Sequence, residues 1–305
     1  MNARTAIPAI LLTIAASSIL AGMDSLGKIL MREFSTVQVT WARFLFHAII
    51  VTLIFLAQGQ RDFLLTRAPR TQLLRGMCMV GINTALYFAI QTVSLAEATA
   101  LMYLAPVLVT LLAGVFLGEK ISPRHLMAVA VGFAGVLVIV RPGFRAFEPE
   151  MLLAFFASLL LSLYFLLTRK VALIDTPRTS LFYTSIVGAV VLSGIVPYWW
   201  KAPDLTQWLL LIAMGALGAT GHFLFIKAYT LLSASELSPW LNSQVVAATL
   251  FSVFVFQDVL GWNFFLGAGL IVGAGLLLSL HRRAVSAASY PRSLQGESRG
   301  ETREP

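Results

Sequence analysis

Apolar stretches of about 20 residues alternate with short polar connections over most of the 305-residue chain. A helix of about 20 apolar residues crosses the roughly 30 Å hydrocarbon core of a bilayer. Ten such stretches lie between Ala6 and His281. The pattern therefore predicts an all-α integral membrane protein with ten transmembrane helices. The predicted spans are residues 6–24, 36–57, 72–92, 96–118, 124–141, 150–170, 178–200, 205–230, 234–257 and 260–281.

The two halves of the chain repeat each other. Residues 94–121 and 232–260 are both long apolar segments that close on an acid, Glu119 and Asp258, 139 positions apart. Five spans in each half is an odd number, so the second copy is inverted relative to the first. Inverted repeats are typical of secondary transporters. We expect a first repeat at residues 1–145, a second at 146–283, and a disordered cytoplasmic tail at 284–305.

The first apolar stretch has an alternative interpretation as a signal peptide. Arg4 precedes it, and Leu20, Ala21 and Gly22 offer small residues for cleavage. Its counterpart in the second half lies in mid-chain, where a signal peptide has no place. The symmetry therefore favours a first span that is retained.

The basic residues predict the orientation of the chain. With both termini in the cytoplasm, the inner segments hold twelve Lys and Arg residues and the outer segments five, leaving out the distal tail. The net charge of +8 is then explained by topology and by anionic lipid headgroups. Because the cations form no continuous stripe, nucleic acid is not an expected partner. We expect a multi-pass protein of the cell inner (plasma) membrane.

Enzyme motifs are weak in this sequence. Cys78 is the single cysteine, and the four histidines show no metal-ligand spacing. Residues 22–28 spell GxxxxGK, but Ile29 follows where a phosphate loop needs Ser or Thr, and the segment ends a membrane helix. We therefore expect no catalytic residues, no cofactor and no metal site, although an integral membrane enzyme remains an alternative class.

Polar residues within the spans are costly in hydrocarbon and tend to face the bundle interior or a wet cavity. Asn83, Tyr87 and Gln91 recur every four residues on one face of the third span, and His222 and Tyr229 share a face of the eighth. These spans are symmetry partners, so a central cavity should collect their side chains. Interhelical hydrogen bonding is the alternative role for each. The candidate substrate-binding residues are Asn83, Tyr87, Gln91, Tyr103, Tyr164, His222, Tyr229, Trp240, Asn242 and Gln244.

A second set of residues is predicted to serve as gate or coupling groups. Asp24 and Lys28 are spaced i, i+4 and are expected to pair. Arg43 needs a carboxylate, a carbonyl or a route to water. Pro106 removes a backbone hydrogen bond and should kink the fourth span. The two acids that close the repeated segments form a hypothetical latch. The set comprises Asp24, Lys28, Arg43, Pro106, Glu119 and Asp258.

Small residues recur in the fifth and tenth spans. Gly269 and Gly273 in one, and Ala128, Gly132 and Gly135 in the other, would let helix backbones approach closely. A role in packing helices within the bundle is the favoured interpretation. A homodimer contact is the alternative.

Several segments resemble a known family. The stretch ATALMYLAPVLVTLLAGVFLGEKIS, followed by GFAGVLVIVRPG, and a weaker second copy ending GAGLIVGAGLLLSL resemble the EamA family of the drug/metabolite transporter superfamily. QVTWARFLFHA and GHFLFIKAY look like its subgroup of S-adenosylmethionine and riboflavin uptake carriers. The resemblance implies an inner-membrane carrier whose central cavity uses spans one, three, four, six, eight and nine. The second half departs from the family pattern at residues 256–258, where glycine and glutamate are common.

The expected function is therefore a carrier that moves a small organic metabolite by alternating access. The substrate would be a vitamin or cofactor such as riboflavin or S-adenosylmethionine, or an amino-acid-like compound. Export by the same family and a transport-inactive membrane scaffold are the alternatives. If protons drive transport, Asp24, Glu97, Glu236 and His222 are the candidate carriers.

Overall fold

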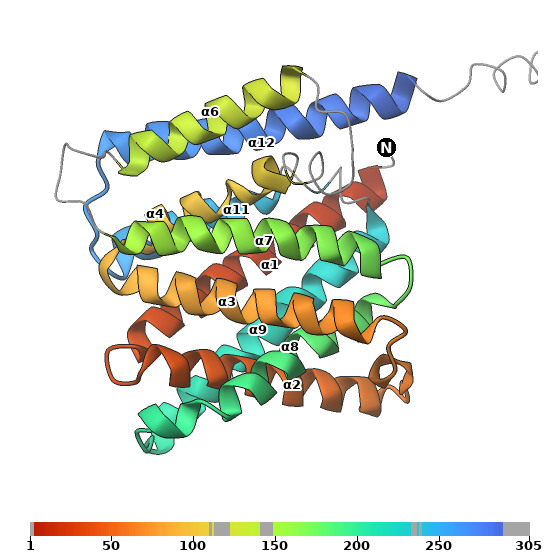
Figure 1. Cartoon of the computed structure of the whole chain (residues 1–305), viewed down its shortest axis with the longest axis vertical. Coiled ribbons are helices and arrows are strands. Elements are labelled where there is room, and N and C mark those ends of the chain that lie inside the picture. The colour runs from red at the N-terminus through yellow and green to blue at the C-terminus, as the bar shows by residue number, and fades with distance from the viewer. Residues whose placement is uncertain are drawn as a thin grey trace, which may run out of the picture.

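The computed structural model describes residues 3–109, 112, 123–140, 149–232, 237 and 240–288, and within these ranges the regular structure is helical (Figure 1). The α-helices are α1 (Ala3–Leu30), α2 (Thr36–Ala57), α3 (Pro69–Thr92), α4 (Leu95–Met102), α6 (Pro123–Val140), α7 (Glu150–Val171), α8 (Pro177–Ser193), α9 (Leu205–Leu231), α11 (Ser243–Phe254) and α12 (Trp262–Ala288). Short 3₁₀ turns, η1 (Asp62–Leu64) and η2 (Val196–Trp199), lie in two of the connections.

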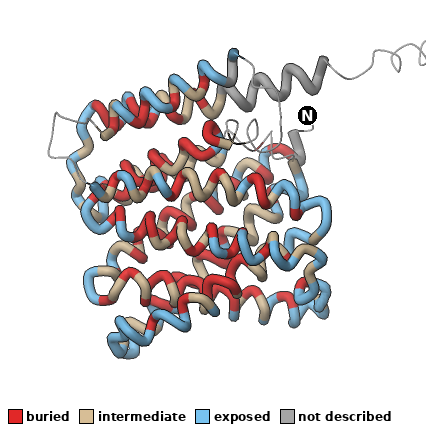
Figure 2. Tube along the Cα trace, viewed as in Figure 1, coloured by how far each residue is buried: buried red, intermediate tan, exposed pale blue. Residues whose placement is uncertain are grey.

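Each of these helices overlaps one predicted span, so the ten-helix fold is confirmed. Five of the described helices, α1, α2, α3, α7 and α9, are long and apolar enough by themselves to cross a membrane. The fourth and ninth predicted spans run into residues outside the described ranges, which shortens the helices seen there. Large apolar side chains such as Leu53 and Phe254 are exposed, while Asp24 and Arg43 are buried. Figure 2 shows the buried residues on helix faces that meet inside the bundle.

The packing of the helices reveals the inverted repeat. The symmetry partners are α1 and α7, α2 and α8, α3 and α9, α4 and α11, and α6 and α12. Helix α1 packs on α9, and correspondingly α7 packs on α3. In the same way α2 packs on α9 and α8 on α3, while α1 packs on α11 and α7 on α4. The pairs α2·α8, α4·α11 and α6·α12 are their own images. A pseudo-two-fold axis therefore relates the two halves.

Side-chain caps fix where the helices begin. The Ser35 hydroxyl accepts a hydrogen bond from the Gln38 N–H at the start of α2, and Thr176 caps α8 in the same way. Ser94 caps α4, and Asp204 forms a capping box with Gln207 on α9. Such caps satisfy backbone donors that have no partner within the helix. The equivalent caps on α2 and α8 repeat the symmetry at the level of single residues.

The fourth and ninth spans are both interrupted. Helix α4 ends at Met102, Tyr103 and Leu104 form a turn, and the helix resumes with Pro106 in its first turn. This agrees with the predicted proline kink. The sequence predicts no equivalent break in the ninth span, yet a turn at Asn242 interrupts the helix there as well. Asn242 lies 139 residues after Tyr103, so the two interruptions are symmetry-related.

The connections gather at two ends of the bundle. At one end Arg178 lies 4.0 Å from Asp62, joining the α7–α8 connection to the α2–α3 connection. At the other end Lys201 forms an ion pair with Glu33 at 3.0 Å. A ten-span topology with cytoplasmic termini, as expected from the sequence, assigns the α2–α3 and α7–α8 connections to the cytoplasm. It assigns the connections that contain Glu33 and Lys201 to the outside. The structure thus brings together connections that the distribution of charge assigns to the same side.

Helices α6 and α12 pack against each other through Gly135, one of the predicted packing positions, and Gly267, which was not predicted. A Cβ on Gly135 would lie 2.6 Å from the Gly267 carbonyl oxygen, and the converse distance is also 2.6 Å. A Cβ on Gly269 or Gly273 would meet nothing within 4 Å. Among the described residues no helix approaches closely at Gly269 or Gly273, so the predicted packing role is wrong for these two positions within this part of the chain.

Candidate substrate site

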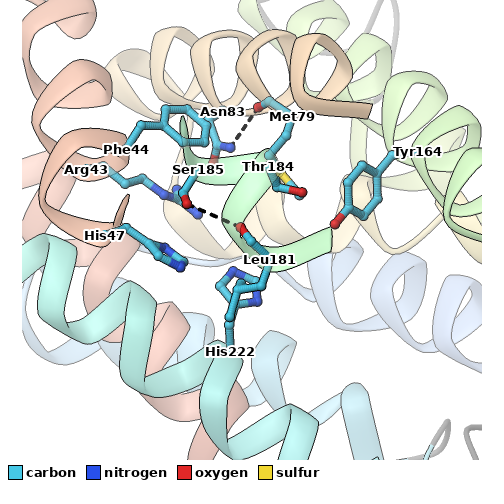
Figure 3. A pocket seen from close by; sticks show the side chains of 10 residues that line it. All are labelled: Arg43, Phe44, His47, Met79, Asn83, Tyr164, Leu181, Thr184, Ser185 and His222. Atoms are coloured by element: carbon cyan, nitrogen blue, oxygen red, sulfur yellow. Dashed lines mark hydrogen bonds between the residues drawn. The ribbon is translucent and has the colours of Figure 1, made fainter. Parts of the chain in front are cut away.

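A small polar cavity of about 40 Å³ lies where five helices of the two halves meet. Its ten lining residues are Arg43, Phe44 and His47 from α2, Met79 and Asn83 from α3, Tyr164 from α7, Leu181, Thr184 and Ser185 from α8, and His222 from α9 (Figure 3). A space of this size holds a few water molecules or one head group, since sites for whole ligands measure about 300–1,000 Å³. The cavity is therefore nearly closed in this conformation.

Arg43 supplies a buried cation to the cavity. Its Nη1 donates to the Asp24 carboxylate at 3.2 Å and to the Tyr87 hydroxyl at 3.0 Å. Tyr87 in turn donates to Asp24 at 3.3 Å. The three side chains come from α2, α1 and α3 and are all buried. Because Asp24 neutralises the guanidinium, the arginine is held in place without an isolated buried charge.

Two histidines form the next part of the wall. The rings of His47 and His222 lie 5.5 Å apart, centroid to centroid, on α2 and α9. Within the described part of the chain the buried Nε2 of His47 has no hydrogen-bond partner. Gly218 on α9 makes room for this ring, because a Cβ there would lie 3.3 Å from its Nδ1. An unpartnered polar atom beside a cavity is a natural contact for a ligand or a water molecule.

The opposite side of the cavity presents amide and hydroxyl oxygens. Asn83 donates its amide N–H to the Met79 carbonyl at 2.7 Å. Thr184 donates to the Ser180 carbonyl at 2.7 Å, and Ser185 donates to Phe182 at 2.9 Å. Each hydroxyl proton is therefore used by its own helix. The oxygen lone pairs remain as acceptors.

Tyr164 connects the cavity to a polar cluster around Arg75 on α3. Arg75 Nη2 donates to the Tyr164 hydroxyl at 2.9 Å, and its Nε donates to the Thr168 hydroxyl at 2.9 Å. Its Nη1 donates to the Gln72 side chain at 2.6 Å. Arg75 is 2% exposed. This cluster ties α3 to α7 beside the cavity.

The structure brings only some of the predicted binding residues together. Asn83, Tyr164 and His222 line the cavity, and Tyr87 reaches it through Arg43. Tyr103 and Gln244 bond to each other instead, at 3.2 Å between α4 and α11.

The remaining predicted binding residues lie elsewhere. Gln91 donates to Thr36, and Tyr229 is half-exposed and stacks on Phe225. Trp240 and Asn242 line a separate, mainly apolar groove of about 570 Å³ between α1, α11 and α12.

Two predictions about the gate residues need correction or qualification. Asp24 pairs with Arg43 and not with Lys28, whose ammonium donates to the Val93 carbonyl at 3.1 Å. The Oδ2 of Asp258 is buried and has no hydrogen-bond partner among the described residues. Glu119 lies outside the described residues, so the latch formed by Glu119 and Asp258 stays a prediction.

The cavity is lined largely by the second and seventh spans, which the family resemblance did not implicate. Among the described residues, spans one, four and nine contribute no side chain to its lining.

Sequence reasoning missed several residues of this site. His47 lies one helical turn after Arg43, and that i, i+4 spacing of two polar groups in an apolar span is a signal for a shared face. Thr184 and Ser185 gave a weaker signal, because hydroxyl residues are common within membrane helices. Arg75 gave no signal for a site, since a cation near a span end usually reaches water.

The architecture defines the class of protein. Two inverted five-helix repeats that enclose a polar cavity between them form a multi-pass membrane transporter. The chain belongs to the EamA-like transporter family, whose model matches residues 7–141 and 149–280. Fold and family together identify a carrier of small organic metabolites.

Individual relatives agree with this assignment. An S-adenosylmethionine uptake transporter of Rickettsia bellii is 26% identical over 255 residues, covering 84% of this chain and 87% of the relative. A riboflavin transporter of Brucella anthropi is 29% identical over 238 residues, covering 76% and 84%. A protein of known crystal structure, 21% identical, has the same fold with a TM-score of 0.60 over 91% of this chain and 98% of its own.

Proposed function

We propose that the protein is an inner-membrane carrier that takes up a small vitamin or cofactor, of the riboflavin or S-adenosylmethionine class, by alternating access. The observation that carries this proposal is the buried Asp24–Arg43–Tyr87 group beside a polar cavity between the two repeats. Charged groups within a membrane are expensive and generally mark a substrate path. The names of two sets of relatives supply the two candidate substrates.

Alternating access is supported by the size of the cavity and by the broken helices. A cavity of about 40 Å³ cannot hold a nucleoside or a flavin, so the halves must move apart to admit either one. The interruptions at Tyr103 and Asn242 offer symmetric points at which α4 and α11 can bend. The Arg75 cluster would then close the cavity toward one side of the membrane.

We further propose that both termini are cytoplasmic. The excess of Lys and Arg in the α2–α3 and α7–α8 connections supports this orientation, and those connections meet at one end of the bundle. Cysteines introduced at exposed Leu65 and Tyr198 test it, after Cys78 is replaced by Ala. In intact cells a membrane-impermeant thiol reagent should label the second position and spare the first.

Transport itself is tested with the purified chain in liposomes. Counterflow of labelled riboflavin and of labelled S-adenosylmethionine is measured for the wild type, Tyr103→Ala, His222→Ala and the control Thr52→Val. Among the described residues, the Thr52 hydroxyl bonds the Ala48 carbonyl of its own helix and no other group, and Thr52 is not part of the cavity lining. Counterflow of either compound that is reduced by His222→Ala supports the proposal. Absence of flux for both compounds and for an amino-acid panel, in folded protein, would overturn it.

Direction and energy source are separate questions. Uptake against a gradient is compared with export from loaded cells. Neutralising Asp24, Glu97, Glu236 and His222 tests proton coupling, and accumulation that survives all four changes rejects it.

The alternative of a transport-inactive scaffold has its own test. Deleting residues 284–305 should abolish a scaffold role and leave a carrier intact.

A further inference from the structure

The cavity brings hydrogen-bond donors of α2 together with side-chain oxygens of α3 and α8, and His222 and Tyr164 complete its polar lining. The donor wall consists of Arg43 and of His47, whose Nε2 donates when it carries the proton of the neutral imidazole, and both residues belong to α2. The acceptor wall consists of Asn83, Thr184 and Ser185, from α3 and α8. Figure 3 shows the donor wall extending from α2 toward the space that α8 and α9 border. A ligand that fits must be anionic or rich in acceptors at one end and must donate hydrogen bonds at the other.

The donor wall has unused capacity. A guanidinium carries five N–H groups, and both of the Arg43 bonds in the structure use Nη1. Its Nε and Nη2 edge therefore has no partner among the described residues. That edge has the fork geometry that binds a carboxylate through two parallel bonds. His47 is only 6% exposed, and its Nε2 likewise has no hydrogen-bond partner among the described residues.

The acceptor wall is complementary. Its two hydroxyls have given their protons to backbone carbonyls, and one of the two Asn83 amide N–H groups is used in the same way, so the oxygens of all three side chains keep lone pairs as acceptors. Asn83, Thr184 and Ser185 are 3%, 8% and 2% exposed. Three neutral acceptors close together suit an ammonium, which brings three donors and no acceptor.

The balance of charge and the size of the space restrict the ligand further. Asp24 already neutralises Arg43, so a group with no net charge enters without leaving a buried charge uncompensated. About 40 Å³ suffices for a head group and not for a nucleoside. We propose that the cavity binds the zwitterionic head group of an α-amino acid, with its carboxylate on the donor wall and its ammonium on the acceptor wall.

This inference rests on the carrier function proposed above and narrows its substrate class. It requires that the transported metabolite carries an α-amino-acid end, as S-adenosylmethionine does and riboflavin does not. The rest of such a substrate would occupy space that opens when the repeats separate.

Head-group probes test the inference without knowledge of the full substrate. Thermal stabilisation of the purified full-length protein is titrated with methionine, 3-(methylthio)propylamine, which lacks the carboxylate, and 4-(methylthio)butanoate, which lacks the ammonium. We expect methionine to bind at least about tenfold more tightly than either truncated probe, because each leaves one wall unpartnered. Equal stabilisation by all three, or none by any of them, overturns the inference.

Two variants assign the walls. Arg43→Lys keeps the charge that Asp24 needs but lacks the forked edge, so it should reduce the preference for methionine over the propylamine at least about threefold. Thr184→Val should reduce the preference for methionine over the butanoate in the same manner. Thr52→Val, a control that removes the same kind of helix-bonded hydroxyl away from the cavity, should change neither ratio. If the control changes them as much as Thr184→Val does, the assignment of the acceptor wall is wrong.

Counterflow separates this inference from the carrier function. Flux of riboflavin that methionine does not inhibit overturns the head-group site and leaves the carrier standing. Binding of methionine with the expected ratios, but no flux of any compound, supports the head-group site and overturns the carrier function. Flux of S-adenosylmethionine that S-adenosylhomocysteine inhibits and 5′-methylthioadenosine does not supports both.

Discussion

The hydroxyl of Tyr103 donates a hydrogen bond of 2.7 Å to the backbone carbonyl of Leu241. The donor stands at the interruption of the fourth span, and the acceptor stands next to the interruption of the ninth. The Val245 N–H, four residues after Leu241, bonds to Asn242 at 3.0 Å. A side chain in one repeat thus bonds the backbone at the symmetry-related weak point of the other.

Tyr103→Phe should lower the free energy of unfolding by about 1 kcal/mol, because it leaves a part-buried carbonyl without its partner. Tyr183→Phe is the matched control, since its hydroxyl bonds the Leu64 carbonyl at 2.9 Å in an exposed position. The control should change stability by less than half as much. Thermal unfolding in detergent measures both. Equal effects would show that the repeat contact has no special weight.

The buried pair of Asp24 and Arg43 predicts strong coupling. Asp24→Leu or Arg43→Leu alone should destabilise the protein by about 3–5 kcal/mol, because each leaves an uncompensated buried charge. The double variant should be far less destabilised than the sum of the two. Glu33→Gln, at an ion pair whose side chains are more than half exposed, should cost at most about 1 kcal/mol. Additive single effects at Asp24 and Arg43 would contradict the pairing.

The same pair shows where sequence reasoning succeeds and where it ends. Ten spans and their inversion are encoded in apolar runs and in an odd count of helices, which are properties of single segments. The partner of Asp24 depends on how α1 and α2 are rotated against each other. Sequence spacing favoured Lys28 because only contacts within one helix can be counted. His47, Thr184 and Ser185 likewise come together at the cavity through packing between helices, which the sequence of a single span cannot predict.

The chain departs from the family pattern at Gln257, where the backbone conformation favours glycine. Gln257 has a φ of +58°, a left-handed conformation that costs a non-glycine residue about 1–2 kcal/mol. Gly118 occupies the corresponding place in the first repeat of the sequence. Gln257→Gly should therefore raise the free energy of unfolding by about 1 kcal/mol, with Gln257→Asn between the two. Chemical denaturation in detergent measures the order, and a destabilised glycine variant would contradict the argument.

The contact between α6 and α12 separates two kinds of glycine. Gly135→Ala would place a methyl group 2.6 Å from the Gly267 oxygen and should cost about 1–3 kcal/mol. Gly269→Ala and Gly273→Ala meet open space and should be neutral or stabilising by up to about 1 kcal/mol. If these two destabilise the protein only where it self-associates, measured by light scattering alongside unfolding, a homodimer uses that face.

Asp175, outside the membrane spans, predicts a pH dependence of stability. It lies between α7 and α8 and accepts hydrogen bonds from the Thr66 hydroxyl, the Arg67 N–H at 3.0 Å and the Gln72 amide at 2.8 Å. Partial burial alone would raise the pKa of this carboxyl. The hydrogen bonds and the nearby charge of Arg67 outweigh it, so the pKa lies below the ordinary value of 3.8.

A carboxyl whose pKa is lower in the folded state stabilises the fold above its unfolded pKa and loses that contribution as the pH falls through the folded value. The difference in melting temperature between the wild type and Asp175→Asn should therefore be constant from pH 7 to about pH 5 and should shrink below about pH 4. Thr66→Val removes one donor, so the difference between this variant and the wild type should shrink over the same range. A difference that grows on acidification would mean that the folded state raises this pKa, and that the bonds joining the α2–α3 and α7–α8 connections do not favour the carboxylate.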